Sequence, residues 1–139
     1  MAENIYCRIN GTSFDVDVAI GGYKRKFEVL HGENAGRSEV AGNMILDPIG
    51  TYLGREITFF RKGNSAEAVQ AFDRLWDFLV LHSVDEDGVF LEAADGQGTI
   101  AMQAYYSSSV QEIEAVVNGV RYWGQFTVNF IPMEAQVTP

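Results

Sequence analysis

The chain has few of the residues that signal disulfide bonding, secretion or a membrane. It contains one cysteine, Cys7, among 139 residues, so no disulfide can form within the chain. No apolar run reaches the length of a membrane span. The first ten residues, MAENIYCRIN, lack the basic stretch and following apolar stretch of a secretory signal. We therefore expect no membrane partner and a protein that is made and kept in a cytosol.

Basic residues are scarce and unevenly placed. The chain has 10 Lys and Arg against 19 Asp and Glu, a formal net charge of -9. After Lys62 only Arg74 and Arg121 oppose eleven acidic residues, so the second half carries the whole deficit. Lys and Arg that neutralise phosphates supply most of the affinity of a protein for nucleic acid. This balance argues against a protein that wraps DNA or RNA tightly.

Sequence motifs for catalysis are missing as well. There is no glycine-rich phosphate loop, zinc-ligand spacing or nucleophile elbow. His31 and His82 each lie at the end of an expected element, where a histidine commonly meets water or free carbonyl groups. An enzyme would have to use one of them with Asp47 and Arg37, a pair more simply interpreted as an ion pair that shapes a loop. Cys7 has the spacing of a core residue. We predict no catalytic residue, no metal and no cofactor.

The chain is rich in alternating apolar and polar residues, which indicates strands. Hydrophobic residues make up 47% of the sequence, enough for one globular domain of this length. Asn10-Gly11 and Asn118-Gly119 are strong hairpin-turn signals, and Gly21-Gly22 is a further turn candidate. The expected strands, about eight in number, cover residues 5–9, 14–20, 23–30, 55–61, 89–94, 99–107, 110–117 and 120–131.

One segment has helical periodicity, residues 66–82. Asn64 or Ser65 is a suitable N-cap, and Asn64 with Glu67 approximates a capping box. The apolar residues fall on one wide stripe, which must lie on a sheet; they are Val69, Phe72, Leu75, Trp76, Phe78, Leu79 and Val80. The sequence therefore predicts a single-domain, β-rich α+β fold: a two-sheet β-sandwich or partly closed barrel with one flanking α-helix.

Residues 31–52 join two expected strands and are too long and glycine-rich for a tight turn. Loops of more than about 12 residues are usually functional in compact domains. Because no partner group for catalysis occurs elsewhere, we interpret this loop as an arm that contacts a neighbouring subunit. The residues predicted to make the contact are Asn34, Arg37, Met44, Ile45, Leu46, Asp47 and Ile49.

From Tyr23 onward the chain resembles a family of small proteins from the tail modules of bacteriophages and prophages. The most specific parts of the resemblance are Asn34-Ala35-Gly36-Arg37, Gly42-Asn43-Met44, Asp47 with Gly50-Thr51, Tyr122-Trp123-Gly124 and Phe130-Ile131-Pro132-Met133. The expected architecture is also similar to the tail-tube module. Such modules typically form hexameric rings in which sheet edges pair between subunits.

The resemblance implies a non-enzymatic virion protein, made in the bacterial host cytoplasm, that forms a ring of the tail tube or its distal end. Its partners would be further copies of itself, other phage tail proteins and DNA that passes through the lumen without specific binding. An acidic lumen would repel that DNA; candidates are Glu92, Asp95, Glu112 and Glu114. Two alternatives stay open: a small β-barrel that binds a ligand and, with less support, a hydrolytic enzyme.

Overall fold

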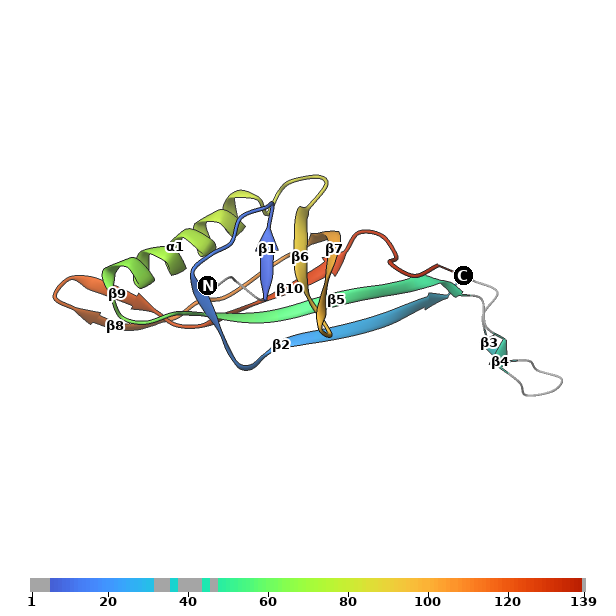
Figure 1. Cartoon of the computed structure of the whole chain (residues 1–139), viewed down its shortest axis with the longest axis horizontal. Helices are drawn as coiled ribbons and strands as arrows, with labels where there is room; N and C mark the ends of the chain where they lie inside the picture. Colours follow the sequence, from blue (N-terminus) through green and yellow to red (C-terminus); the bar gives the residue numbers. More distant parts are fainter. Residues whose placement is uncertain (1–5, 32–35, 38–43, 46–47, 139) are drawn as a thin grey trace.

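The computed structural model describes residues 6–31, 36–37, 44–45 and 48–138. The elements in these residues (Figure 1) are β1 (Cys7–Ile9), β2 (Val16–His31), β3 (Gly36–Arg37), β4 (Met44–Ile45), β5 (Pro48–Arg61), α1 (Ala66–Leu81), β6 (Val89–Asp95), β7 (Gly98–Tyr105), β8 (Ile113–Val117), β9 (Val120–Trp123) and β10 (Phe126–Pro132). The predicted β-rich α+β class with one helix is confirmed.

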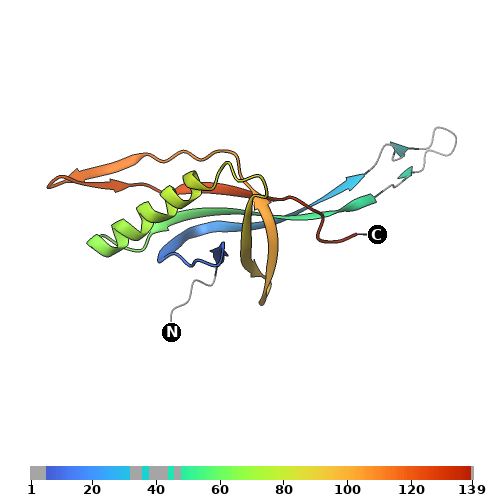
Figure 2. The ribbon, with the colours of Figure 1, turned by 90° about the horizontal axis from the view of Figure 1, so that it is seen from above.

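Six strands form one antiparallel sheet in the order β1-β6-β7-β10-β5-β2. Strand β10 joins its two parts, because residues 126–130 pair with β5 whereas Ile131 and Pro132 pair with β7. In Figures 1 and 2, β1, β6 and β7 run steeply across the long axis of β2 and β5. The edge strands β1 and β2 do not pair with each other, so these strands form no closed barrel.

The core lies where α1 and strands β1, β6 and β7 cover β5 and β10. Alternate residues of β10 are buried, as the period-two pattern predicts. Phe126 stands opposite Phe59 and Val128 opposite Ile57, which places four apolar side chains together. The other large buried apolar side chains of this cluster are Ile9, Phe72, Leu75, Leu79, Val89, Leu91, Met102 and Phe130.

Helix α1 begins where the sequence predicts. Ser65 is the N-cap, and its side chain accepts a hydrogen bond from the backbone N–H of Ala68. Asn64 instead accepts a hydrogen bond from Arg61. The buried stripe includes Ala68 and Ala71, whereas Val80, which we placed on it, is 57% exposed. The buried positions of α1 are 68, 71, 72, 75 and 79, and their spacing of three or four residues places them on one side of the helix.

Strand β2 is longer than expected. The sequence predicts two strands separated by a turn at Gly21-Gly22, but both segments pair with β5, and the glycines lie in a bulge between Val18 and Tyr23. Gly21 adopts a φ of 72°, which favours glycine. The bulge turns Ile20, expected on the buried face, fully into solvent.

The boundaries of the 31–52 connection also differ from prediction. His31 pairs with Pro48 and Leu30 with Gly50, so residues 48–52 belong to β5 rather than to a loop. Strands β3 and β4 form a further short pair, Gly36 with Ile45 and Arg37 with Met44. The glycines of residues 31–52 favour a loop in the sequence, but backbone pairing of residues 48–52 with β2 outweighs the low strand propensity of Gly50.

Candidate functional site

The far part of the β2–β5 pair, residues 26–31 and 48–54, extends beyond α1 and the crossing strands (Figure 1). We call it the ribbon. Large apolar side chains are exposed on it: Phe27 is 70% exposed, Leu30 43% and Ile49 50%. The C-terminal segment covers part of β5 here, since the Thr51 N–H donates to the Val137 carbonyl and the Gln136 N–H to the Thr51 carbonyl, but these three apolar side chains stay exposed. Phe27 and Leu30 lie three positions apart in β2 and so face opposite sides of the ribbon, and we treat these exposed apolar side chains as a candidate interaction site.

The predicted arm residues are only partly located by the structure. Ile49 is an exposed residue of the ribbon, as the arm hypothesis requires. The backbones of Arg37, Met44 and Ile45 belong to the β3–β4 pair. Three predicted contact residues lie outside the described residues: Asn34, Leu46 and Asp47.

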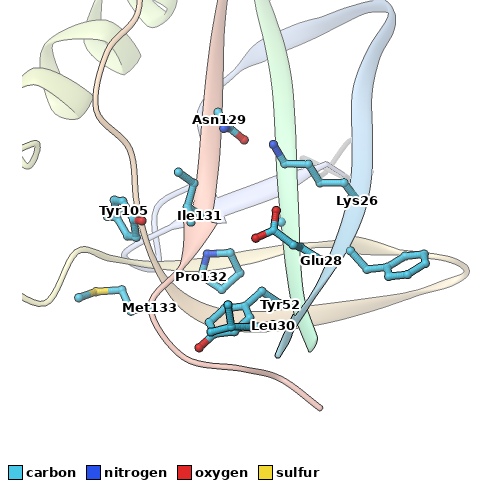
Figure 3. Close-up of a pocket in the computed structure, with 11 residues that line it drawn as sticks. Lys26, Glu28, Leu30, Tyr52, Tyr105, Asn129, Ile131, Pro132 and Met133 are labelled. Atoms are coloured by element: carbon cyan, nitrogen blue, oxygen red, sulfur yellow. The ribbon is translucent and has the colours of Figure 1, made fainter. Parts of the chain in front are cut away.

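A groove of about 540 Å³ lies beside the ribbon (Figure 3). Lys26, Glu28 and Tyr52 of the ribbon form one wall, and the opposite wall consists of Tyr105, Ile131, Pro132 and Met133. Most of this lining is apolar or aromatic. The sequence did not reveal this groove, because it joins the end of β10 to the ribbon across a large sequence separation.

One polar atom of the groove lacks a partner. The Oδ1 atom of Asn129 is buried and accepts no hydrogen bond from the described residues. Buried polar side-chain atoms are nearly always paired, so an orphan acceptor needs an explanation. Figure 3 places the Asn129 side chain at one end of the groove, near Lys26. Because this oxygen has almost no exposed surface, a molecule bound in the groove would contact the other lining residues rather than this atom.

The β8–β9 hairpin is a second exposed apolar region. Every residue of β8 is exposed, including Val116 at 60% and Val117 at 52%, and Val120 of β9 is 43% exposed. The predicted Asn118-Gly119 turn is confirmed, with φ values of 52° and 78°. The expected long strand 120–131 is divided at Gly124, where the hairpin leaves the main sheet.

Arg61 holds the base of this hairpin. Its Nη1 atom donates hydrogen bonds to Glu114 Oε1 at 2.7 Å and to the carbonyl of Trp123 at 2.8 Å. Its guanidinium also lies 5.4 Å from the ring centre of Tyr122. The base is therefore fixed to the end of β5, whereas the tip carries exposed valines.

A buried arginine ties the two parts of the sheet together. Arg55 is 1% exposed and donates to the carbonyls of Ala94 and Gly54, and its Nη2 atom lies 3.0 Å from Asp95 Oδ1. Tyr23 donates to the same Ala94 carbonyl at 2.7 Å, and burial raises the pKa of this tyrosine. The only feature of the sequence that indicates a buried Arg55 is its position on the same strand face as Ile57 and Phe59.

The four acidic lumen candidates have different surroundings. Asp95 pairs with Arg25 and Arg55, and Glu114 pairs with Arg61, so arginines offset both carboxylates. Glu112 is exposed and Glu92 half-buried, and neither has an ion pair within the described part of the chain. A lumen position for these residues stays a prediction.

The titratable residues considered for catalysis lie on different elements. His31 ends β2 and is exposed, whereas His82 caps the C-terminus of α1 and its Nδ1 lies 2.7 Å from Asp85 Oδ2. Burial raises the pKa of the Cys7 thiol to about 12, which suppresses the thiolate form. In residues 6–31, 36–37, 44–45 and 48–138, no three His, Cys, Asp or Glu side chains gather as a metal site.

Two further observations concern the chain as a whole. Within the described residues, no helix is long and apolar enough to cross a membrane. Neither a model of a known protein family nor a curated protein matches the sequence. The phage-tail resemblance therefore stays a hypothesis, and the ribbon, the groove and the β8–β9 hairpin are the surfaces on which a function can be argued.

Proposed function

We propose that the protein is a non-enzymatic bacteriophage structural protein that assembles into a ring of the tail tube or its distal end. One observation supports this most: the chain forms a well-packed core and yet leaves two apolar regions, the ribbon and the β8–β9 hairpin, outside it. A second copy that covers these side chains would remove them from water.

The sheet edges favour the same proposal. Strand β2 is 16 residues long and lies at an edge of the six-stranded sheet. A long edge strand offers unpaired backbone groups to other chains, which proteins usually avoid. The basic residues Lys24, Arg25 and Lys26 guard this edge against random pairing, while a specific neighbour could still use it.

The resemblance to phage tail modules suggests which oligomer the protein forms. In that family the expected oligomer is a hexameric ring that stacks on other tail proteins, with DNA passing through its lumen. Glu92 and Glu112 would be the lumen charges here, because Asp95 and Glu114 are already paired with arginines. A lumen with net negative charge lets DNA pass without sticking to it.

Negative-stain electron microscopy of the purified protein tests the proposal. We expect annular particles or stacked rings. Deletion of residues 33–44 should abolish the rings while the β-type circular dichroism spectrum stays intact, because the arm adds a necessary part of the contact between subunits. The Val84→Asp variant, changed at an exposed turn, is the control and should still form rings. A protein that stays monomeric at high concentration would contradict the proposal.

A further inference from the structure

The tip of the β8–β9 hairpin is exposed on both faces. Val117 and Val120 stand opposite each other across the two strands, and Val116 stands opposite Arg121. All three valines are at least 43% exposed. An isolated two-stranded hairpin is marginally stable in water, and only its base is held here, by Arg61. This tip needs a surface that its own subunit does not supply.

The groove beside the ribbon has the matching properties. The wall opposite the ribbon consists of Tyr105, Ile131, Pro132 and Met133 and offers apolar and aromatic surface. Tyr105 is 45% exposed and Met133 is 41% exposed. The ribbon, which forms one wall of the groove, and the β8–β9 hairpin extend toward opposite ends of the long molecule (Figure 1), so a subunit cannot place its own hairpin in its own groove.

Glu28 and Arg121 carry opposite charges on the two surfaces, and Lys26 lies beside Glu28 in the same groove. Glu28 lies on the ribbon wall of the groove (Figure 3), and Arg121 lies beside the valines of the hairpin. Both are exposed, and within the described residues neither has an ion-pair partner. A partner with an apolar tip and one adjacent cation therefore fits this groove, and the same chain carries such a tip.

We propose that the β8–β9 hairpin of one copy docks into the groove of the next copy, with Arg121 facing Glu28. The inference rests on the proposed function and specifies the contact between subunits. The contact is head-to-tail, because each copy uses a different surface toward each neighbour. Contacts of this type generate rings when the rotation between copies closes.

Two variants with one defective surface each provide the test. The hairpin variant is Val116→Asp/Val120→Asp, and the groove variant is Tyr105→Asp/Met133→Asp; all four positions are exposed, so folding should tolerate the changes. Leu81→Asp/Val84→Asp adds the same charge at exposed apolar positions outside β2, the groove and the hairpin and is the matched control. Size-exclusion chromatography with light scattering gives the mass, and circular dichroism checks each fold.

Each variant alone should be a monomer, whereas the control should assemble as the wild type does. An equimolar mixture of the two variants should form 1:1 dimers and nothing larger, since only one intact hairpin and one intact groove can meet. Assembly of the groove variant into wild-type rings would overturn the docking inference and leave the ring proposal standing. A monomeric wild type would overturn both.

The charge pair gives a second readout. Glu28→Arg and Arg121→Glu should each raise the concentration needed for half-maximal assembly about tenfold, because like charges then face each other. The double variant Glu28→Arg/Arg121→Glu should return close to the wild-type value. Additive weakening in the double variant would show that these two residues do not meet.

Discussion

The two ends of the β2–β5 pair have the same backbone pairing and opposite surroundings. At one end Val18 stands opposite Phe59, and both pack in or against the core under α1. At the other end Phe27 stands opposite Leu53 and is 70% exposed. The difference is the covering layer, because the ladder continues through both ends. Hydrogen-bonded pairing is therefore insufficient to define the core, and the uncovered end is available for another chain.

The largest effect on stability is expected in the aromatic centre of the covered end. Phe126 contacts the rings of Phe59, Phe72 and Trp76, with centroid distances of 5.7, 5.5 and 5.0 Å. Phe126→Ala should lower the free energy of unfolding by about 4 kcal/mol, since it removes buried surface and leaves a cavity. Urea denaturation measures this. A loss below about 1 kcal/mol would show that the cluster packs loosely.

The next largest effect is expected at the buried ion pair between the sheet parts. Asp95→Ala should cost about 3 kcal/mol, because it leaves the Arg55 guanidinium buried without its anion. Glu56→Ala removes the exposed pair with Lys24 and is the control, with an expected loss below about 1 kcal/mol. Equal losses in the two variants, measured by urea denaturation, would contradict the structural role of Arg55.

The helix cap should contribute less. Ser65→Ala should lower the free energy of unfolding by about 1 kcal/mol, since the Ala68 N–H loses its acceptor. Ser65→Asp keeps an acceptor at the cap and should restore most of the loss. Thermal unfolding of the three proteins measures the effect, and equal losses for Ala and Asp would contradict the capping role.

Alkaline pH should weaken the contact between Tyr106, which follows β7, and the end of α1. Tyr106 donates a hydrogen bond to the carbonyl of Leu79 at 2.6 Å, and burial raises its pKa from 10.0 to about 12. Its contribution is therefore complete below pH 10 and is lost as the pH rises toward 12, because the unfolded chain releases the proton first. Denaturation at several pH values measures this, and Tyr106→Phe should flatten the slope in that window.

The class and the turns could be predicted from sequence because they rest on local patterns. The alternation in residues 126–130 and the helical stripe before His82 both led to the correct element. Asn118-Gly119 adopts the left-handed conformation that its residue types favour. Two details were predicted wrongly: the buried position of Ile20 and the assignment of residues 48–52 to a loop. Residues 48–52 are a strand because they pair with a distant segment, and the bulge in β2 reverses the face that Ile20 takes.

The candidate site was harder to predict than the fold. Ile49 of the arm hypothesis is 50% exposed, and its contact with a neighbouring subunit stays a prediction. The groove, however, joins Lys26 to Asn129 and Tyr105, and the Arg55 network joins three segments. No local pattern contains such contacts. The β8–β9 hairpin and its turn were predicted, but its exposure was not, because the alternation looks the same whether or not a layer covers the strands.

The smallest effect on stability is expected in the ribbon. Phe27→Ser/Ile49→Ser should change the free energy of unfolding by less than about 1 kcal/mol, since both side chains are at least half exposed. A loss comparable to that of Phe126→Ala, in the same urea titration, would show that the ribbon belongs to the core.

Sedimentation velocity on that ribbon variant tests most directly the claim that the uncovered regions exist for assembly. The wild-type protein should sediment as a ring-sized oligomer, a hexamer if the tail-module resemblance holds. Phe27→Ser/Ile49→Ser should sediment as a monomer with an unchanged melting temperature. A variant that forms the same oligomer as the wild type, or a wild type that stays monomeric at every concentration, would contradict the account.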